Sequence, residues 1–335
     1  MVPRSASGRS SASRPRRLRR RAEVRDLFAQ FEVDAHHLVY PIFVGPGSGR
    51  PTPIASMPGI SRIPAAGAPA FARELSREGV RAVLLFGTPR RKDPRGSEAW
   101  APKNAVHEAI RAFRAEAPEV VVFTDVCLCA YTTHGHCGVA HGGEIANDET
   151  LDLLGRIAVA QAEAGAEFVG PSAMMDHQVA AVREALDAAG HSEVGILAYS
   201  AKFASGLYGP FREAENSTPS FGDRRTYQLD PRNAHDALEA FERDAREGAD
   251  ILMVKPAGTS LDLLARARRR VDRPLAAYQV SGEYAMIKAA AERGWIDEPT
   301  VVAESLTALR RAGADLIVTY FAREIGRAQR GGSGR

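Results

Sequence analysis

A short glycine-containing phrase recurs along this sequence and constrains the fold more than any other feature. It reads E-G-V-R from residue 78, A-G-A-E from residue 164, E-G-A-D from residue 247 and A-G-A-D from residue 312. Each copy lies just before a short apolar run. A glycine there is typical of the residue that ends a helix in a left-handed conformation before a strand begins. The repetition predicts a helix-then-strand unit that the chain uses several times.

Short apolar runs alternate with helical patterns from about residue 36 onward. The eight runs span residues 38–44, 82–87, 120–128, 168–174, 194–203, 251–256, 275–281 and 316–321. They are continuous and rich in β-branched residues, which is typical of strands covered on both faces. Eight such strands in about 290 residues predict an α/β fold of the (β/α)8 TIM barrel class. A doubly wound open sheet is the alternative, but no dinucleotide-binding fingerprint follows the first run.

We expect three parts: an N-terminal basic arm (residues 1–35), a catalytic barrel (36–330) and a flexible tail (331–335). Residues 1–22 contain eight arginines and no acid. Without these arginines, 36 basic residues face 41 acidic ones, so no nucleic-acid partner is expected. We expect roughly the first 14 residues to be disordered and the arm to pack on a neighbouring subunit; a transit peptide is the alternative. No run approaches the roughly 18 apolar residues of a membrane span.

All three cysteines of the chain lie in one 14-residue stretch, D-V-C-L-C-A-Y-T-T-H-G-H-C-G, which begins at residue 125. An odd number of cysteines cannot fully pair, and a bridge between Cys127 and Cys129 would be strained. Three thiolates suit zinc, and three protein ligands leave the open position typical of a catalytic site. We therefore predict a catalytic Zn²⁺ on Cys127, Cys129 and Cys137. Redox chemistry and unused buried thiols remain alternatives.

Reactive side chains gather where the predicted strands end. In this fold active sites lie at the C-terminal ends of the strands, so these residues would meet at one rim. They are Asp125, Cys127, Cys129, Ser172, Lys202, Lys255, Ser281 and Tyr320. Asp125 could act as an acid/base or orient the zinc site.

Two lysines, Lys202 and Lys255, lie at the ends of hydrophobic runs in a chain that has only five lysines among 44 basic residues. A partly buried lysine can lose its proton, especially beside a second cation, whereas an arginine cannot. The pair points to Schiff-base chemistry on a carbonyl substrate. The alternative is that each lysine pairs with a carboxylate.

A long segment without helical periodicity, residues 204–233, separates the fifth run from its helix. Its aromatic residues disfavour disorder, so we expect an active-site lid. Its arginines could clamp carboxylates, although we expect Arg225 to form a structural ion pair. The candidate substrate-binding residues of the segment are Tyr208, Phe211, Arg212, Arg224 and Gln228.

The residues from about Arg16 to Ile325 resemble the porphobilinogen synthase family, also called 5-aminolevulinate dehydratase, of the zinc-dependent type. The matching phrases are Y-P-I-F-V at residue 40, the cysteine stretch at 125, S-A-K-F-A-S at 200, Y-G-P-F-R at 208, F-G-D-R-R-T-Y-Q at 221, M-V-K-P at 253, V-S-G-E-Y at 280 and T-Y at 319.

The resemblance implies condensation of two 5-aminolevulinate molecules to porphobilinogen with loss of two waters, a step of tetrapyrrole and heme biosynthesis. Lys255 would form the Schiff base, and Lys202 would activate or bind the second molecule. Zinc on the cysteines would act as a Lewis acid. Arg212 and Arg224 would bind one carboxylate, and Ser281 and Tyr320 the other. The family is typically a cytoplasmic homo-octamer whose N-terminal arms wrap neighbouring subunits.

The sequence departs from the family at two places. The phrase S-D-M-M-D-G-R of the family reads S-A-M-M-D-H-Q here, and we expect Ala173, His177 and Gln178 to act through neighbouring residues. Ala240 stands fifteen residues before Lys255, where many bacterial members carry a magnesium-binding glutamate, so an allosteric Mg²⁺ is not expected.

Two other functions are alternatives to this one. A Schiff-base aldolase or lyase using Lys255 alone would need no metal, and the cysteine cluster argues against it. A non-catalytic zinc module whose arginine-rich tail binds nucleic acid would bind with strong salt dependence. That hypothesis leaves the two lysines at the ends of the strands unexplained.

Overall fold

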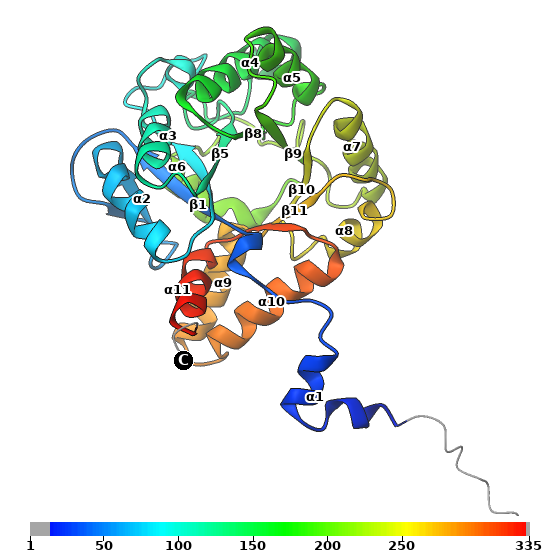
Figure 1. The fold of residues 1–335 in the computed structure, drawn as a ribbon. Coiled ribbons are helices and arrows are strands. Elements are labelled where there is room, and N and C mark those ends of the chain that lie inside the picture. Colours follow the sequence, from blue (N-terminus) through cyan, green and yellow to red (C-terminus); the bar gives the residue numbers. More distant parts are fainter. Residues whose placement is uncertain (1–13, 333–335) are drawn as a thin grey trace, which may run out of the picture. The chain divides into compact units, whose positions relative to one another are not determined.

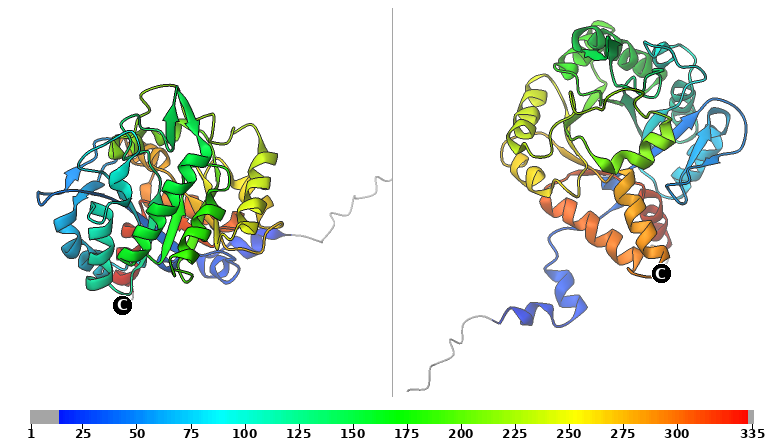
Figure 2. Two further views of the ribbon diagram at one scale, coloured as in Figure 1. Left: turned by 90° about the horizontal axis from the view of Figure 1, so that it is seen from above. Right: turned by 180° about the vertical axis from the view of Figure 1, so that it is seen from behind.

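Eight parallel strands close into a barrel surrounded by helices (Figures 1 and 2). The computed structural model describes residues 14–332. The last barrel strand pairs with the first, with Leu38 opposite Ile317, and this pairing closes the sheet. The strands are β1 (Leu38–Gly45), β4 (Ala82–Gly87), β5 (Val121–Val126), β8 (Phe168–Pro171), β9 (Gly195–Lys202), β10 (Ile251–Lys255), β11 (Leu275–Tyr278) and β12 (Leu316–Val318). Each predicted run contains one strand, so the barrel is confirmed and the open sheet is wrong.

Helices follow the strands on the outside of the barrel. The α-helices are α2 (Ala68–Arg77), α3 (Ala105–Glu116), α4 (Asn147–Ala164), α5 (Gln178–Ala188), α6 (Gly209–Glu215), α7 (Ala234–Arg246), α8 (Leu261–Ala267), α9 (Ser281–Glu292), α10 (Glu298–Ala312) and α11 (Ala322–Gly332). Short 3-10 helices are η2 (Ala35–His37), η3 (Ala65–Gly67), η4 (Ser97–Trp100) and η5 (Gly206–Tyr208).

The recurring glycines end helices as the sequence predicts. Gly79, Gly165, Gly248 and Gly313 have φ angles of +86°, +106°, +102° and +121°. Only glycine adopts such angles at little energetic cost, because any other residue would place its Cβ against the backbone. These four positions therefore set where helices stop and where the next strands start.

The core lies both inside the barrel and between the strands and the helices. Ala68, Ala72 and Leu75 of α2 are buried at helical spacing and form the apolar face of that helix. Inside the barrel, the rings of Phe43 and Phe86 have centroids 5.7 Å apart. Burying each such aromatic side chain stabilises the fold by about 1.5–3 kcal/mol.

Several short strands were not predicted from the sequence. They are β2 (Thr52–Pro53), β3 (Ser61–Pro64) and the hairpin of β6 (Val139–His141) with β7 (Glu144–Ala146). The segment expected to lack regular structure, residues 204–233, contains η5 and α6. Elements this short bury too few residues to leave a periodic pattern in the sequence.

The chain divides into one unit up to Glu32 and another from Val33 onward. The described part of the first unit contains η1 (Pro15–Arg19) and α1 (Ala22–Leu27). The expected disorder of the first 14 residues lies outside the described residues, apart from Arg14. At the other end, α11 runs two residues into the expected tail, and residues 333–335 are not described. Within residues 14–332, no helix is both long and apolar enough to cross a membrane.

Candidate active site

The two lysines expected at the rim lie side by side on adjacent strands. Lys202 ends β9 and Lys255 ends β10, and the two residues are paired in register. Both are buried, with 5% and 4% of their surface exposed. The Lys202 ammonium donates a hydrogen bond to the Ser172 carbonyl. By contrast, Lys255 Nζ lies among aromatic rings, 4.2 Å from the centroid of Tyr278.

The surroundings of Lys255 favour its neutral form. Burial, with the charge of Lys202 as the next cause, lowers its pKa to about 7. At an ordinary pKa near 10.4 only about one lysine in 2,500 would be unprotonated at neutral pH, whereas the lowered pKa of Lys255 makes the neutral amine far more abundant. Lys255 is therefore available as a nucleophile at neutral pH.

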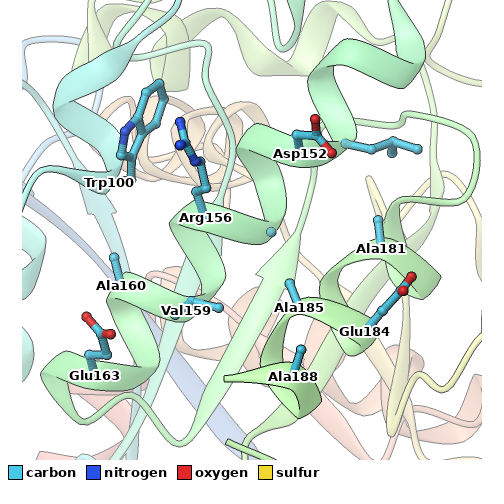
Figure 3. Close-up of a pocket in the computed structure, with 12 residues that line it drawn as sticks. Trp100, Asp152, Arg156, Val159, Ala160, Glu163, Ala181, Glu184, Ala185 and Ala188 are labelled. Carbon is cyan, nitrogen blue, oxygen red and sulfur yellow. The ribbon is translucent and has the colours of Figure 1, made fainter. Parts of the chain in front are cut away.

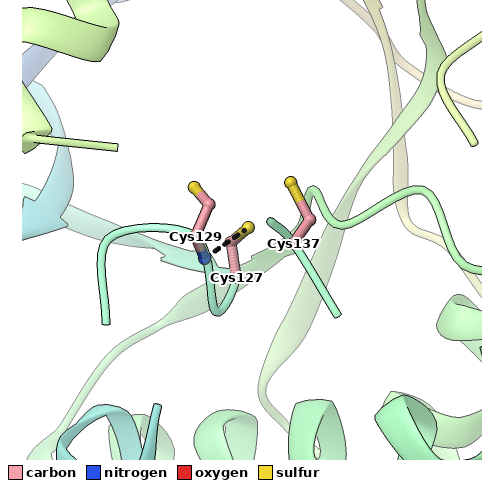
Figure 4. A group of neighbouring side chains, drawn as sticks. All are labelled: Cys127, Cys129 and Cys137. Atoms are coloured by element: carbon pink, nitrogen blue, oxygen red, sulfur yellow. Dashed lines mark hydrogen bonds between the residues drawn. The ribbon is translucent and has the colours of Figure 1, made fainter. Parts of the chain in front are cut away.

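The three cysteines form one buried cluster in the loop after β5. Their sulfur atoms all lie within 4.8 Å of one another, and none is in a disulfide. Figure 4 shows Cys127 and Cys129 on one turn of the chain and Cys137 on a neighbouring stretch. Hydrogen bonds among the thiols lower the pKa of Cys137 and raise the pKa of Cys129. Three buried sulfur donors this close together fit a soft or borderline metal ion.

A small enclosed cavity of about 10 Å³ lies at the C-terminal end of the barrel. It brings together eight residues expected at the site, namely Asp125, Cys129, Ser172, Lys202, Tyr208, Phe211, Arg224 and Lys255. The Oδ1 atom of Asp125 is sealed from solvent and has no hydrogen-bond partner among residues 14–332, and burial raises the pKa of this carboxyl. The cavity has room for about one water molecule.

The segment after β9, residues 204–233, covers this cavity at the C-terminal end of the barrel. Tyr208 Oη lies 2.7 Å from the Phe203 carbonyl and 3.1 Å from the Lys255 carbonyl, which fixes the ring over the end of β10. The Phe211 amide donates to Ser281 Oγ over 3.0 Å. The segment therefore lies as a lid across the barrel mouth, in a position that the sequence predicts.

The lid is also tied to the loop that carries the cysteines. Arg224 donates to the carbonyls of Gly135 and Ser217, at 2.8 and 2.6 Å. His136 Nδ1 lies 3.0 Å from Tyr227 Oη, and its Nε2 lies 2.9 Å from the Phe221 carbonyl. Both ring nitrogens of His136 therefore contact the lid. Among the described residues, the cluster of possible metal ligands contains cysteines alone. Movement of the lid must disturb the cysteine loop.

Other expected site residues carry buried polar atoms that make no hydrogen bond within the described chain. Arg212 Nε and both amide atoms of Gln228 are buried without a hydrogen-bond partner among the described residues. Tyr320 is buried with its hydroxyl 3.3 Å from that of Tyr278. Arg225 is exposed and lies 3.7 Å from Asp223, in the ion pair expected of it.

A sequence model of the family described as Delta-aminolevulinic acid dehydratase matches residues 12–328. The chain belongs to this family.

Curated members with that description are close in sequence. The one from Synechococcus elongatus is 48% identical over 318 residues, which is 94% of this chain and 98% of that protein. The one from Mycobacterium tuberculosis is 51% identical over 92% of this chain and 95% of that protein.

A solved structure of a Delta-aminolevulinic acid dehydratase supports the fold. The crystal structure of the Toxoplasma gondii ME49 enzyme, also called porphobilinogen synthase, in complex with the reaction product porphobilinogen matches with a TM-score of 0.91. It is 43% identical, and the match covers 94% of this chain and 91% of that one.

The departures from the usual family phrase lie in the loop after β8. Gln178 accepts a hydrogen bond from the Met174 amide over 2.9 Å and donates one to the Pro171 carbonyl over 3.2 Å. His177 Nδ1 lies 2.9 Å from Glu247 Oε1. These contacts shape the loop that presents the Ser172 carbonyl to Lys202, so an effect of the departures through neighbouring residues stays our prediction.

Three residues near the candidate site were not predicted from the sequence. Tyr199 and Tyr278 belong to the strands β9 and β11, and their rings face the ammonium of Lys255. Glu215 is buried, and its Oε2 atom lies 3.7 Å from Cys129 Sγ. A glutamate at the end of a short helix usually faces solvent, so nothing in the pattern could have marked it.

A larger pocket of about 550 Å³ lies elsewhere, between α4 and α5 (Figure 3). Trp100, Arg156 and Glu184 are among the side chains that line it. It contains no cysteine, lysine or histidine, and its charged residues are Asp152, Arg156, Glu163 and Glu184. None of the site residues expected from the sequence lines this pocket.

Proposed function

We propose that this chain is a porphobilinogen synthase that condenses two 5-aminolevulinate molecules into porphobilinogen with the loss of two waters. One observation carries the proposal: two buried lysines, in register on neighbouring strands, face one cavity beside a cluster of three cysteines. The crystallised relative from Toxoplasma gondii holds porphobilinogen, the product of this reaction.

The first chemical step is the attack of the neutral Lys255 amine on the keto carbon of one substrate molecule. The nitrogen forms a C=N bond, and the keto oxygen leaves as the first water. That oxygen needs protons, and the Asp125 carboxyl, whose pKa is raised by burial, is the acid/base that we assign to it. Lys202, fixed by the Ser172 carbonyl, would orient the second molecule.

Closure of the pyrrole ring joins the two molecules through one C–N bond, whose formation releases the keto oxygen of the second molecule as the second water, and one C–C bond at the imine carbon. The bond from that carbon to Lys255 then breaks, and the lysine leaves as the free amine. We assign one substrate carboxylate to Arg212 and Arg224, whose planar guanidinium groups suit it, and the other to the hydroxyls of Ser281 and Tyr320. The buried Nε donor of Arg212, which has no partner in the described part of the chain, supports the first assignment. Substrate access requires the lid to move, because the cavity of about 10 Å³ is far too small for two such molecules.

The cysteine cluster is the proposed metal site, with Cys127, Cys129 and Cys137 as ligands. Zinc bound there would supply a Lewis acid and a water or hydroxide for the second substrate molecule. An allosteric magnesium is not proposed, because the Ala240 side chain offers no ligand atom.

We also propose that the enzyme is a cytoplasmic homo-oligomer, with an octamer expected from the family resemblance. Support comes from the N-terminal arm, the basic segment up to residue 35, where apolar side chains lie open to solvent. Leu18, Leu27 and Phe28 are exposed by 50%, 79% and 58%. Burial of such side chains against another subunit would stabilise an assembly.

Covalent trapping tests the Schiff base directly. The protein is mixed with 5-aminolevulinate and reduced with sodium borohydride, and the peptides are mapped by mass spectrometry. We expect one substrate-derived adduct on the peptide that contains Lys255. An adduct on Lys202 alone, or no adduct in a metal-loaded protein, would contradict the assignment.

The lowered pKa of Lys255 predicts how the reaction depends on pH. Because the amine reacts only when unprotonated, kcat/KM should fall below pH 7, approaching tenfold per pH unit, and level off above it. The measurement is kcat/KM from about pH 5 to 9, with bound metal determined at each pH. A rate that keeps rising to pH 9 while the metal content stays constant would mean that the Lys255 pKa is not lowered.

A further inference from the structure

A buried carboxylate at the start of α9 joins two segments of the site, and the mechanism above gives it no role. Glu283, the third residue of that helix, has only 8% of its surface exposed. Its Oε1 atom accepts a hydrogen bond from the Gly258 amide over 2.8 Å, and its Oε2 atom accepts one from the Val280 amide over 2.7 Å. Both oxygens are therefore paired with backbone donors, as a buried carboxylate requires.

Each of the two segments carries a residue of the proposed mechanism. Gly258 lies three residues after Lys255, in the loop that follows β10. Val280 directly precedes Ser281, the first residue of α9, in the turn that follows β11. The strands β10 and β11 are paired neighbours. Glu283 therefore ties the loop after the Schiff-base lysine to the turn that carries the hydroxyl assigned to a substrate carboxylate.

The glycine at residue 258 shows how closely the carboxylate approaches the loop. A Cβ atom on Gly258 would lie 2.3 Å from Glu283 Oε1, far inside van der Waals contact. Gly258 does not have a positive φ angle, so its backbone conformation would accept another residue. The approach of the Glu283 carboxylate is therefore what favours a glycine at this position.

The bonds of Glu283 do not involve the lid, whereas those of the Ser281 hydroxyl do. Ser281 Oγ accepts a hydrogen bond from the Phe211 amide and donates one to the Leu207 carbonyl, at 3.0 and 3.4 Å. Both partners belong to residues 204–233, which must move before substrate can enter. That movement would free the hydroxyl for a carboxylate, and the two bonds of Glu283 would keep the turn in place.

We propose that Glu283 is a positioning residue that holds the Ser281 hydroxyl in a fixed place relative to Lys255, so that one substrate molecule can reach both groups. The inference rests on the proposed function, because it needs the Schiff base on Lys255 and a substrate carboxylate at Ser281. Glu283 itself does not contact the substrate and acts through the turn that it holds.

The test compares borohydride trapping on Lys255 with two ketones that cannot form a pyrrole. Levulinate is the substrate without its amino group, and 2-butanone lacks the carboxylate as well. The reactions are run at about pH 8.5, because burial raises the pKa of Glu283 to about 7 and the ionised carboxylate accepts both bonds. Each ketone is used at one concentration far below saturation, and the adduct is measured by mass spectrometry.

Glu283→Gln should lower the yield of levulinate adduct about tenfold and change the yield with 2-butanone by less than twofold. The glutamine amide places an N–H group against one of the two backbone donors, so one bond is lost and the turn is displaced. Glu292→Gln is the matched control, since Glu292 lies exposed at the other end of α9. This control should match the parent with both ketones.

A double substitution shows whether Glu283 acts through Ser281. Ser281→Ala should itself lower the yield of levulinate adduct. Adding Glu283→Gln to it should lower the yield by less than a further twofold, because the hydroxyl to be positioned is already gone. A full further tenfold loss would contradict the inference, since Glu283 would then act on another part of the site.

Two other outcomes would overturn the inference. Glu283→Gln that traps levulinate like the parent would show that the carboxylate only caps the helix, and an equal loss with both ketones would show a disturbed Lys255. A parent protein that traps neither ketone on Lys255 would overturn the proposed function and the inference with it. If Glu283→Gln fails to fold by circular dichroism, Gly258→Ala is measured with the same expected results, because its Cβ atom would displace the carboxylate.

Discussion

Replacing Lys255 by methionine is expected to abolish porphobilinogen formation, with a loss of more than about 1,000-fold, while the fold is retained. Methionine has a similar length and no charge, so it fits among the rings of Tyr199, Phe211 and Tyr278 that surround the ammonium. What it lacks is the nitrogen that forms the C=N bond. The measurement is product formation from 5-aminolevulinate, with circular dichroism to verify folding.

Lys288→Met is the matched control for this substitution. Lys288 lies on α9 and forms ion pairs with Glu298 and Glu324, away from the cavity at the barrel mouth. Its loss should leave turnover within about twofold, because surface ion pairs contribute little to stability. Retention of more than a tenth of the parent activity by Lys255→Met would show that the covalent step uses another group.

Replacing Cys127 by alanine is expected to remove bound metal and turnover together, each by more than about 100-fold. Two remaining thiols provide too few sulfur ligands for tight binding, and the neighbouring histidine, His136, is committed to the lid through both ring nitrogens. Metal content after dialysis, measured by mass spectrometry of the metal, and activity at saturating substrate check both parts.

His134→Ala, in the same loop, is the control for the cysteine substitution. Its Nε2 lies 3.2 Å from the Pro94 carbonyl, and it is not part of the ligand cluster among the described residues. This variant should keep its metal. A Cys127→Ala protein that turns over at the parent rate without metal would refute the role of the cluster in catalysis.

The barrel and its rim could be predicted because both leave periodic signals in the sequence. The glycines of the recurring phrase take up positive φ angles, and only glycine serves there. Residues at the ends of parallel strands must meet at one edge, so Lys202 and Lys255 could be placed together before any coordinates. The barrel topology alone therefore explains why the positions of these two lysines could be predicted.

The features that could not be predicted depend on contacts between segments that are far apart in the sequence. Glu215 is like any surface glutamate until α6 is folded against the cysteine loop, and Gly209 and Pro210 at the start of that helix hide its periodicity. Similarly, His136 resembles a metal ligand in the sequence, and only the lid above it shows that its nitrogens are occupied. Contacts between distant segments carry no local signal.

The most direct test of the account is formation of porphobilinogen from 5-aminolevulinate by the purified protein, before and after removal of metal with a chelator and after addition of zinc. We expect product from the untreated protein, none after chelation, and recovery with zinc. Product that is indifferent to chelation would contradict the catalytic role of the cysteine cluster, and no product under any metal would contradict the proposed reaction.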